Sequence, residues 1–279
     1  MLYIKNELQD PYINQAFEEY VFDRFKGEDV LLLWVNKPCV VSGRYQNVFE
    51  EIDIARALRE NIPVIRRNTG GGTVFHDLGN LNYTIMHQAE DGEMLDYDNF
   101  ILPMIEALNS IGIPAHKRRS SDIAIDDKKI SGSAANVSHG KMLHHGTLLF
   151  NTDMSLLHGL LSGAKGNFVS KAIASVRSEV TNIKEYCEIE TLEELKEKLL
   201  KAFNVTEEKT LSEEDFLQVR KIAESKYMTD EWTYCRGPKF SHTTENGKTE
   251  IFVEKGIIIK SNNPELVGMD AKSYFGEIL

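Results

Sequence analysis

The chain is organised around the stretch Arg66-Arg67-Asn68-Thr69-Gly70-Gly71-Gly72-Thr73-Val74-Phe75-His76-Asp77-Leu78-Gly79-Asn80, which follows an apolar, strand-like run at 62–65. Consecutive glycines can adopt positive φ, and the successive N–H groups of such a turn form a concavity that binds anions. The arginine pair adds cations that suit a phosphate or a carboxylate. A plain Gly-rich turn beside an exposed arginine pair is the alternative. The arginines before the glycines and the His-Asp-x-Gly-Asn run after them favour a ligand-binding loop.

Composition bounds the class of protein. The chain has 279 residues, 42% of them hydrophobic, and a net charge of −11. This length allows one large domain, or one domain with a small appendage. The acidic balance argues against nucleic-acid binding and against a polybasic membrane anchor. No apolar run approaches the roughly 18 residues of a membrane-spanning helix, and the N-terminus lacks the pattern of a signal peptide. The cysteines at 39, 187 and 235 are odd in number and widely spaced, which fits reduced thiols in a cytoplasmic protein.

Strand and helix signals alternate irregularly along the chain. A helix is expected from Asp10-Pro11 onward, with an apolar face that includes Phe17 and Phe25 and with Glu18 on the opposite, polar side. Strands are expected near 30–35, 39–42, 80–86, 121–125 and 142–150, and helices near 54–60, 100–111, 154–161, 191–203 and 212–226. The strand signals are too dense for regular βαβ units. We therefore predict an α/β protein of the α+β type, with a mixed, largely antiparallel sheet flanked by helices.

The last part of the chain changes character. Two short strands are expected at 249–253 and 256–259, followed by a polar tail. We expect a main domain at 1–230 and a small C-terminal appendage at 231–279. Between the main elements, residues 163–177 form a long polar stretch with little periodicity, and such stretches are often functional lids.

Two further groups of residues could carry chemistry. In Lys128-Lys129-Ile130-Ser131-Gly132-Ser133-Ala134, strand alternation places the two lysines on opposite faces, and we favour Lys129 for the cleft. In the pair His144-His145, one ring could bind a ligand or act in catalysis, or both could merely pack. The spacing of histidines and cysteines does not match a structural zinc site. No Walker loop, dinucleotide fingerprint or nucleophile elbow is present.

Taken together, these stretches resemble the lipoate–protein ligase A family. The matching pieces are 41–47, 66–83, Asp122, 129–134, 144–151, 173–178 and 180–182, in the order and spacing of the family from about residue 1 to 240. The resemblance implies the fold of the biotin/lipoate protein ligase superfamily, which octanoyltransferases share. It also implies two steps, in which ATP and lipoate give lipoyl-adenylate and pyrophosphate before the lipoyl group passes to a lysine of a carrier domain. The domain at 1–230 would then be catalytic.

The same resemblance implies roles for individual residues. Lys129 and Asp122 correspond to catalytic residues at the adenylate. The residues implied to contact the nucleotide or line the pocket are Arg67, Gly70, Gly71, Gly72, Thr73, Val74, Phe75, Asn80, Lys129 and His145. ATP and lipoate would be the small-molecule substrates, and Mg²⁺ is expected with ATP. No dedicated metal site is expected.

The expected partners are carrier proteins with a lipoyl-accepting lysine, either an E2 subunit of a 2-oxoacid dehydrogenase or the glycine cleavage H protein. The chain stops at Leu279, before the accessory domain of the fullest family members would be complete, so a second accessory subunit is a possible partner. Two alternatives remain open at this point. One is an ATP-independent lipoyl or octanoyl transferase, which would need a cysteine nucleophile if it forms an acyl-enzyme, and the other is a non-catalytic protein that binds lipoate or a nucleotide.

Overall fold

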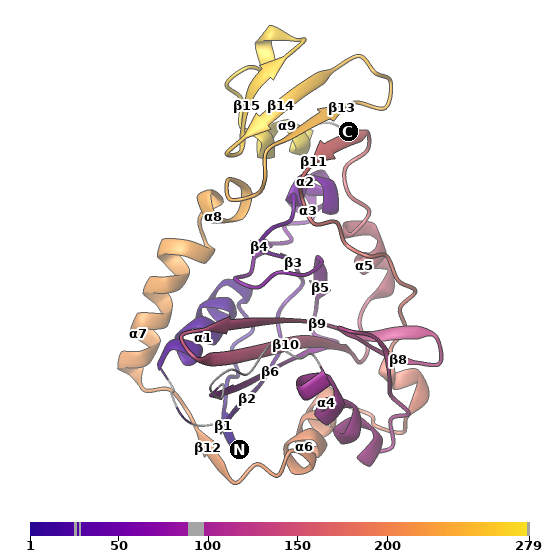
Figure 1. Ribbon diagram of the computed structural model, residues 1–279, viewed down its shortest axis with the longest axis vertical. Coiled ribbons are helices and arrows are strands. Elements are labelled where there is room, and N and C mark those ends of the chain that lie inside the picture. The colour runs from indigo at the N-terminus through magenta and orange to yellow at the C-terminus, as the bar shows by residue number, and fades with distance from the viewer. Residues whose placement is uncertain (25–26, 28, 89–97, 278–279) are drawn as a thin grey trace. The chain divides into compact units, whose positions relative to one another are not determined.

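The computed structural model describes residues 1–24, 27, 29–88 and 98–277, and Figure 1 shows their helices and strands. The chain divides into two compact units, between which it passes repeatedly. The first, which we call the sheet unit, comprises residues 1–37, 76–153 and 177–222. The second, which we call the loop unit, comprises residues 38–75, 154–176 and 223–279. The division expected at residues 230 and 231 stays a prediction.

The sheet unit is built on an eight-stranded sheet in the order β12-β1-β2-β6-β10-β9-β8-β7. The strands are β12 (Glu207–Lys209), β1 (Leu2–Ile4), β2 (Val30–Trp34), β6 (Asn80–Gln88), β10 (Lys141–Leu149), β9 (Lys128–Ser138), β8 (Asp122–Ile125) and β7 (His116–Arg119). The pairs β12–β1 and β1–β2 are parallel, and every later pair in this order is antiparallel. The prediction of a mixed, largely antiparallel sheet is confirmed.

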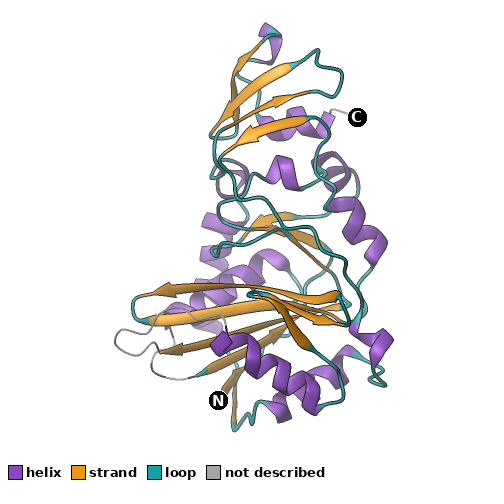
Figure 2. Cartoon of the chain, turned by 45° about the vertical axis from the view of Figure 1, so that its right-hand side comes forward, coloured by secondary structure: helices purple, strands orange, loops and turns teal. Residues whose placement is uncertain are grey.

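Strand alternation gives this sheet two different faces. One face packs its apolar side chains, among them Leu81 and Ile123, against α4 (Asp98–Ser110) and α6 (Leu192–Ala202). Figure 2 shows these helices along one side of the sheet. Burial of each such Leu or Ile side chain contributes roughly 1.5–3 kcal/mol. The other face carries mostly polar side chains over β6 and the middle of β10 and is described below.

Helix α1 (Pro11–Arg24) corrects one expectation. Glu18, expected on the polar side of the helix, is only 6% exposed, and Asn14 and Gln15 are buried as well. Phe25, expected on the apolar face, lies outside the described residues. Helix α7 (Glu213–Ile222) packs beside α1, where the rings of Phe17 and Phe216 are 6.0 Å apart. The remaining short element of this unit is the 3₁₀-helix η1 (Ile183–Tyr186).

The loop unit contains two smaller sheets. A three-stranded sheet has the order β4 (Val64–Arg66), β3 (Cys39–Ser42), β5 (Val74–His76), with β3 and β4 parallel and with the last residue of β5 counted in the sheet unit. A four-stranded antiparallel sheet has the order β11 (Asn167–Ser170), β13 (Phe240–Thr243), β14 (Glu250–Glu254), β15 (Ile257–Ser261). The helices are α2 (Val48–Glu51), α3 (Ile54–Arg59), α5 (Met154–Leu160), α8 (Asp230–Tyr234) and α9 (Ala271–Glu277), with the π-helix η2 (Ala223–Tyr227) and the 3₁₀-helix η3 (Pro264–Leu266).

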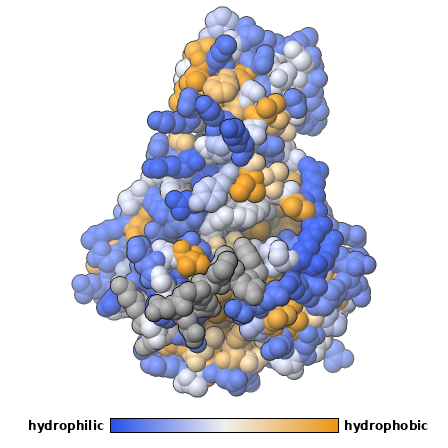
Figure 3. Space-filling view, in the orientation of Figure 1, coloured by the Kyte–Doolittle hydropathy of each residue, from blue (hydrophilic) through white to orange (hydrophobic). Residues whose placement is uncertain are grey.

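An aromatic cluster joins three distant segments of the loop unit. Phe49 of α2 stacks on Phe275 of α9 with 4.9 Å between centroids, and Phe168 of β11 and Phe240 of β13 pack against the same ring. The stretch 163–177, expected to lack regular structure, therefore contains a strand that belongs to the C-terminal sheet. On the face of the molecule shown in Figure 3, the surface is mainly hydrophilic and its apolar residues occur in small groups.

Candidate active site

The polar face of the large sheet brings several predicted site residues together. On β6, Asn80, Asn82 and Thr84 alternate with core residues, and they pair with Leu149, Thr147 and His145 of β10. Asp122 of β8 pairs with Gly132 of β9 on the same face, and the ammonium of Lys129 reaches them. The predicted residues of the sheet unit that lie here are Asn80, Asp122, Lys129 and His145. They come from four strands, and the register of the sheet rather than any loop sets their spacing.

Lys129 and Asp122 form an ion pair. Lys129 Nζ lies 2.8 Å from Asp122 Oδ1, and the carboxylate side chain is only 7% exposed whereas that of Lys129 is 22% exposed. The backbone of Lys129 is held by its N–H, which donates to the carbonyl of Glu179, and by its carbonyl, which accepts from the N–H of Thr181. The preceding Lys128 is different, because its side chain is 43% exposed and reaches Glu179 only at 3.8 Å. The pair thus fixes one ammonium group on the polar face.

Two buried amides on this face are incompletely bonded. Asn80 Nδ2 donates to Asn82 Oδ1 at 2.9 Å. Within the described part of the chain, Asn80 Oδ1 and Asn82 Nδ2 are buried and have no hydrogen-bond partner. Such groups are rare in native proteins and call for a ligand or water. Asn80 Oδ1 and Asn82 Nδ2 therefore provide one acceptor and one donor for a polar ligand or a water on the polar face.

Strand parity separates the two adjacent histidines of β10. His144 lies on the core face, where its ring stacks on Phe100 with 4.9 Å between centroids. Burial lowers the pKa of His144 to about 3, with a smaller contribution from His145, so this ring is neutral at physiological pH. His145 lies on the polar face, and its Nδ1 is 2.8 Å from Glu18 Oε1. His145, which the resemblance implies as a pocket residue, is therefore the histidine of the pair that lies on the polar face, and its contact with a ligand stays a prediction.

Sequence reasoning missed Glu18 as a site residue. Its carboxylate is buried because Thr84 Oγ1 donates to it at 2.6 Å and His145 Nδ1 lies at 2.8 Å, which together replace its hydration. The helical pattern gave no signal for this, since an acidic residue among polar neighbours usually faces water. Asn82 and Thr84 were also missed, although their alternation with Asn80 along one strand could have revealed them.

The glycine loop, residues 66–73, lies in the loop unit and is folded around a guanidinium. Arg67 is 5% exposed, and its Nη2 donates to the carbonyl of Gly72 at 2.8 Å while its Nε donates to Thr69 Oγ1 at 2.9 Å. Gly71 has φ +84°, and its carbonyl oxygen lies 2.0 Å from where a Cβ on Gly43 would be. A side chain at either glycine would force the loop apart. Arg67 therefore shapes the loop through its backbone carbonyls.

Arg66 corrects the expectation that both arginines offer their charge to a ligand. It is fully buried, and among the described residues it donates only to backbone carbonyls. Those carbonyls belong to Gly43, Arg44, Gln46 and Thr233. Burial lowers the pKa of Arg66 to about 10. This guanidinium is a structural tie between the loop and α8.

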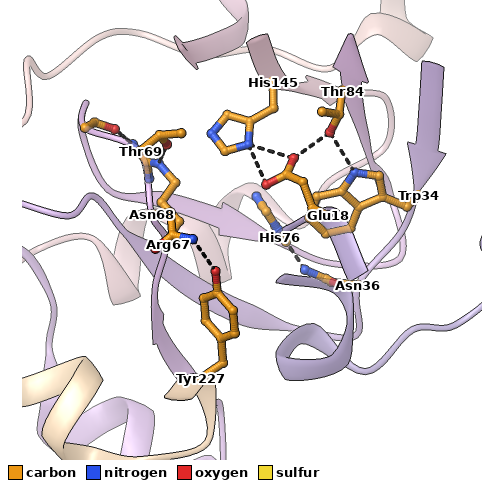
Figure 4. A network of polar contacts seen from close by, with 11 residues as sticks. Glu18, Trp34, Asn36, Arg67, Asn68, Thr69, His76, Thr84, His145 and Tyr227 are labelled. Atoms are coloured by element: carbon orange, nitrogen blue, oxygen red, sulfur yellow. Dashed lines mark hydrogen bonds and ion pairs between the residues drawn. The ribbon is translucent and has the colours of Figure 1, made fainter. Parts of the chain in front are cut away.

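Side chains of the π-helix η2 form a second set of hydrogen bonds to the glycine loop. Asn68 Nδ2 donates to Tyr227 Oη at 2.9 Å, as Figure 4 shows, and Lys226 Nζ donates to Asn68 Oδ1 at 2.7 Å. Trp232 Nε1 donates to the carbonyl of Arg66 at 2.6 Å. π-Helical turns often occur at functional sites. Here the turn at 223–227 presents two successive side chains to one loop residue.

The stretch 163–177 is connected to the glycine loop through Ser175. Its Oγ accepts from the backbone N–H of Thr73 at 2.9 Å and from Gln46 Nε2 at 2.9 Å. Around Ser175, Ile173 and Val176 are exposed apolar residues. The stretch is therefore tied to the loop at one residue and open to solvent on either side of it. Its role as a lid stays a prediction.

We expect this stretch to become protected from trypsin when lipoate and ATP are added together. The reason is that Ser175 bonds to the loop expected to hold the nucleotide, so that ligand binding should order both. Cleavage after the exposed Lys171 is followed by mass spectrometry of the fragments. The variant Ser175→Ala should lose most of the protection, because it removes the hydroxyl. Equal cleavage rates with and without the two ligands would argue against a lid.

The cysteines give little support to an acyl-enzyme. Cys39 is fully buried in β3, and Cys187 packs partly buried against the core of the sheet unit. Burial and the neighbouring acidic residues Glu231 and Asp230 raise the pKa of Cys235. A nucleophilic cysteine needs a lowered pKa. The environment of Cys235 raises the pKa of its thiol instead, which disfavours the nucleophilic thiolate.

Two kinds of feature are absent from the described residues. No helix in 1–24, 29–88 or 98–277 is long and apolar enough to cross a membrane. In the same residues, no group of three or more His, Cys, Asp or Glu side chains could hold a metal ion.

Comparison with known proteins gives a consistent result. The family model for the lipoyl protein ligase A/B catalytic domain matches residues 10–204. The lipoate-protein ligase LplJ of Bacillus subtilis is 36% identical over 250 residues, which cover 86% of this chain and 76% of that protein.

Two solved structures are also similar. Lipoate-protein ligase A bound with ATP has a TM-score of 0.74 at 24% identity, covering 83% of this chain and 97% of that one. A bipartite lipoate protein ligase from Thermoplasma acidophilum, described with its E2 lipoyl domain, has a TM-score of 0.69 at 23% identity, covering 84% of this chain and 95% of that one. At these identities the likeness concerns the fold, and it confirms the predicted fold of the biotin/lipoate ligase type.

Proposed function

Since this chain belongs to the lipoyl protein ligase A/B family, we propose that it converts lipoate and ATP to lipoyl-adenylate and then transfers the lipoyl group to a lysine of a carrier domain. Membership of the family confirms the resemblance seen in the sequence and makes the chain a ligase with lipoate-protein ligase activity. The adenylate intermediate and the carrier domain are what we propose in addition to this activity. The observation that carries them is the Lys129 ammonium held beside Asp122 on the polar face.

The first step needs a fixed cation. When the carboxylate oxygen of lipoate attacks the α-phosphate, negative charge builds on the phosphate oxygens until pyrophosphate leaves. One fixed donor aimed at that charge typically stabilises the transition state by about 3–4 kcal/mol. Asp122 keeps the ammonium of Lys129 in one place, 2.8 Å away, before the substrate binds. Lys129 would therefore stabilise the developing charge without first having to be reoriented.

The glycine loop would hold the nucleotide side of the intermediate. In the proposal, the backbone from Gly70 to Phe75 contacts the phosphates, as its Gly-rich sequence suits close approach of an anion. Arg67 supports this binding through the shape of the loop, since its guanidinium donates to the loop carbonyls. Mg²⁺ would enter as part of the ATP complex with phosphate oxygens as its main ligands, because the described residues offer no cage of their own.

The acyl side of the intermediate would lie along the polar face. Asn80 and His145 are proposed to line this pocket, and Asn82 joins them. The open donor of Asn82 suits a carboxylate or carbonyl oxygen of the acyl group. The open acceptor of Asn80 suits a water or a hydroxyl group in the same pocket.

The proposed partners are small carrier domains with an accepting lysine. A lipoyl domain of an E2 subunit is favoured by the Thermoplasma acidophilum relative, which is described together with such a domain. The glycine cleavage H protein offers the same lysine chemistry. A second accessory subunit is the alternative to activation by this chain alone, since that relative is bipartite. The cytoplasm is the proposed location, because its reducing conditions suit three cysteines that form no disulfide among the described residues.

The test is pyrophosphate release from lipoate and ATP, measured with and without an apo carrier. We expect one equivalent without the carrier, as the adenylate stays bound, and continuous turnover with it. Lipoyl transfer between carriers without ATP would instead support the transferase. Ligand binding with neither pyrophosphate release nor transfer would support a binding protein.

A further inference from the structure

Strand β9 contains a bulge directly after Lys129. Figure 1 shows β9 beside β8 in the large sheet. Ile123 of β8 pairs with Ser131 of β9. The next residue of β8, Ala124, pairs with Lys129, so that Ile130 is an extra residue of β9 which the pairing skips. Bulges of this kind occur next to active sites, where they change the direction of a side chain.

The bulge changes which residues of β9 share a face of the sheet. In an uninterrupted strand, residues three apart, such as Lys129 and Gly132, lie on opposite faces. Here the side chain of Ile130 is fully buried in the core, and the alternation is interrupted at this residue. Lys129 therefore lies on the polar face together with Gly132, which pairs with Asp122 of β8.

The end of the Lys129 side chain lies directly over Gly132. A Cβ on Gly132 would be 2.7 Å from Lys129 Nζ and 2.9 Å from its Cε, closer than the roughly 3.5–4.0 Å of an ordinary contact. In the part of the chain that the structure describes, and apart from the two chain neighbours of Gly132, only Lys129 has atoms within 4 Å of that position. The backbone of Gly132 lies outside the left-handed region, so that alanine can adopt its conformation.

Hydrogen bonds hold the backbone on both sides of this contact. The N–H of Gly132 donates to Thr147 Oγ1 of β10 at 3.3 Å. The N–H and the carbonyl of Lys129 are bonded to Glu179 and Thr181. The side chain of Lys129, in contrast, is a flexible four-carbon stem. A side chain added at Gly132 would therefore move the end of the lysine and leave the two strands in place.

We propose that Gly132 is a positioning residue, because its lack of a side chain leaves free the place in which Asp122 holds the ammonium of Lys129. This inference rests on the function proposed above, in which the ammonium stabilises negative charge on the α-phosphate. Gly132→Ala would displace the ammonium by roughly 1 Å. A misplacement of about this size can lower a reaction rate by about 100-fold. Gly132 thus acts through Lys129.

A crystal structure of Gly132→Ala, determined without substrates, tests the position of the ammonium. We expect the variant to fold and Lys129 Nζ to lie beyond the roughly 3.2 Å of a hydrogen bond from Asp122 Oδ1, instead of at 2.8 Å. An ion pair of unchanged length would overturn the inference. A variant that does not fold would also overturn it, because the added methyl group would then meet more than the end of one side chain. If the wild-type chain releases no pyrophosphate, the proposed function fails, while this structure still decides the positioning.

Single-turnover pyrophosphate release at saturating lipoate and ATP tests the consequence for the reaction. Gly132→Ala should slow this release by about 10- to 100-fold. In a Lys129→Ala background the same substitution should cause no further loss, since no ammonium is left to displace. A purely structural role of Gly132 would give the same loss in both backgrounds, and that result would contradict the proposal.

Gly276→Ala is the matched control. A Cβ on Gly276, in α9, would also meet the end of one flexible side chain, because it would lie 2.7 Å from Leu58 Cδ1. Leu58 is 43% exposed and can move into solvent. We expect Gly276→Ala to release pyrophosphate at the wild-type rate. A loss as large as that of Gly132→Ala would mean that an added methyl group slows the reaction without displacing Lys129, and the role assigned to Gly132 would then be wrong.

Discussion

Lys129→Ala is expected to lower the rate of pyrophosphate release from lipoate and ATP by about 100- to 1000-fold or more, while the protein still folds. The substitution removes the ammonium that Asp122 holds on the polar face. It keeps the backbone hydrogen bonds that Lys129 makes with Glu179 and Thr181, so the local strand geometry should survive. The measurement is single-turnover pyrophosphate release, accompanied by circular dichroism and thermal unfolding to check the fold.

Lys128→Ala is the matched control, since it removes the same side chain one residue earlier. The Lys128 side chain is 43% exposed, and its ion pair with Glu179 is long, at 3.8 Å. Exposed pairs of this kind contribute little, so the loss of Lys128 should change neither activity nor stability appreciably. Asp122→Asn adds a second comparison, because it frees the Lys129 ammonium without removing it. Pyrophosphate release by Lys129→Ala at the wild-type rate would exclude the acyl-adenylate site assigned to the polar face.

Arg66→Met is expected to lower the free energy of unfolding by at least about 3 kcal/mol. Arg66 is fully buried, and the five hydrogen bonds that its guanidinium makes within the described part of the chain all go to backbone carbonyls. Methionine fills similar space but donates no hydrogen bond to these carbonyls, and each buried carbonyl that loses its donor costs about 1–3 kcal/mol. The carbonyl of Gly43 is the least affected, because it also accepts from the N–H of Gln46. Urea denaturation measures the change through the midpoint and its slope.

Two further variants serve as comparisons for Arg66→Met. Arg66→Lys should be almost as unstable, because one ammonium cannot serve the carbonyl of Thr233 and those of the 43–46 turn together. Arg59→Met, at an exposed position of α3, removes an arginine from the same unit and should change stability by no more than about 0.5 kcal/mol. If Arg66→Met and Arg59→Met unfold at the same urea concentration, the tie assigned to Arg66 does not exist.

The elements and the faces of the strands could be predicted because their signals are local. Alternation along β6 identifies Asn80 as facing opposite to Leu81 and Tyr83, and the same parity separates Lys128 from Lys129. Parity alone does not say which face meets the core, since that depends on where α4 and α6 pack. This is why strand parity alone left the choice between His144 and His145 open. The resemblance to the family implied His145, and the packing places the ring of His145 on the polar face.

The residues that could not be predicted are those whose partners are distant in the chain. Glu18 is buried by Thr84 and His145, which lie 66 and 127 residues further along. β11 is a strand only because β13 pairs with it. Arg66, close to three glycines, has the local pattern of a cation that binds an anion. Nothing in the neighbouring sequence indicates that it donates to the backbone carbonyl of Thr233.

The tie at Arg66 has a consequence for how the protein is made on the ribosome. Arg66 and Thr233 are separated by 167 residues, so the glycine loop leaves the exit tunnel long before its last carbonyl acceptor is synthesised. Until Thr233 has been synthesised, the guanidinium of Arg66 lacks one of its carbonyl acceptors and remains hydrated. The turn at 43–46 is then not yet connected to α8. Domains generally fold as units during synthesis, from the N-terminus onward. In this chain the glycine loop is completed only after Thr233 has been synthesised, so a nascent chain stalled before α8 would carry the whole motif without its mature shape.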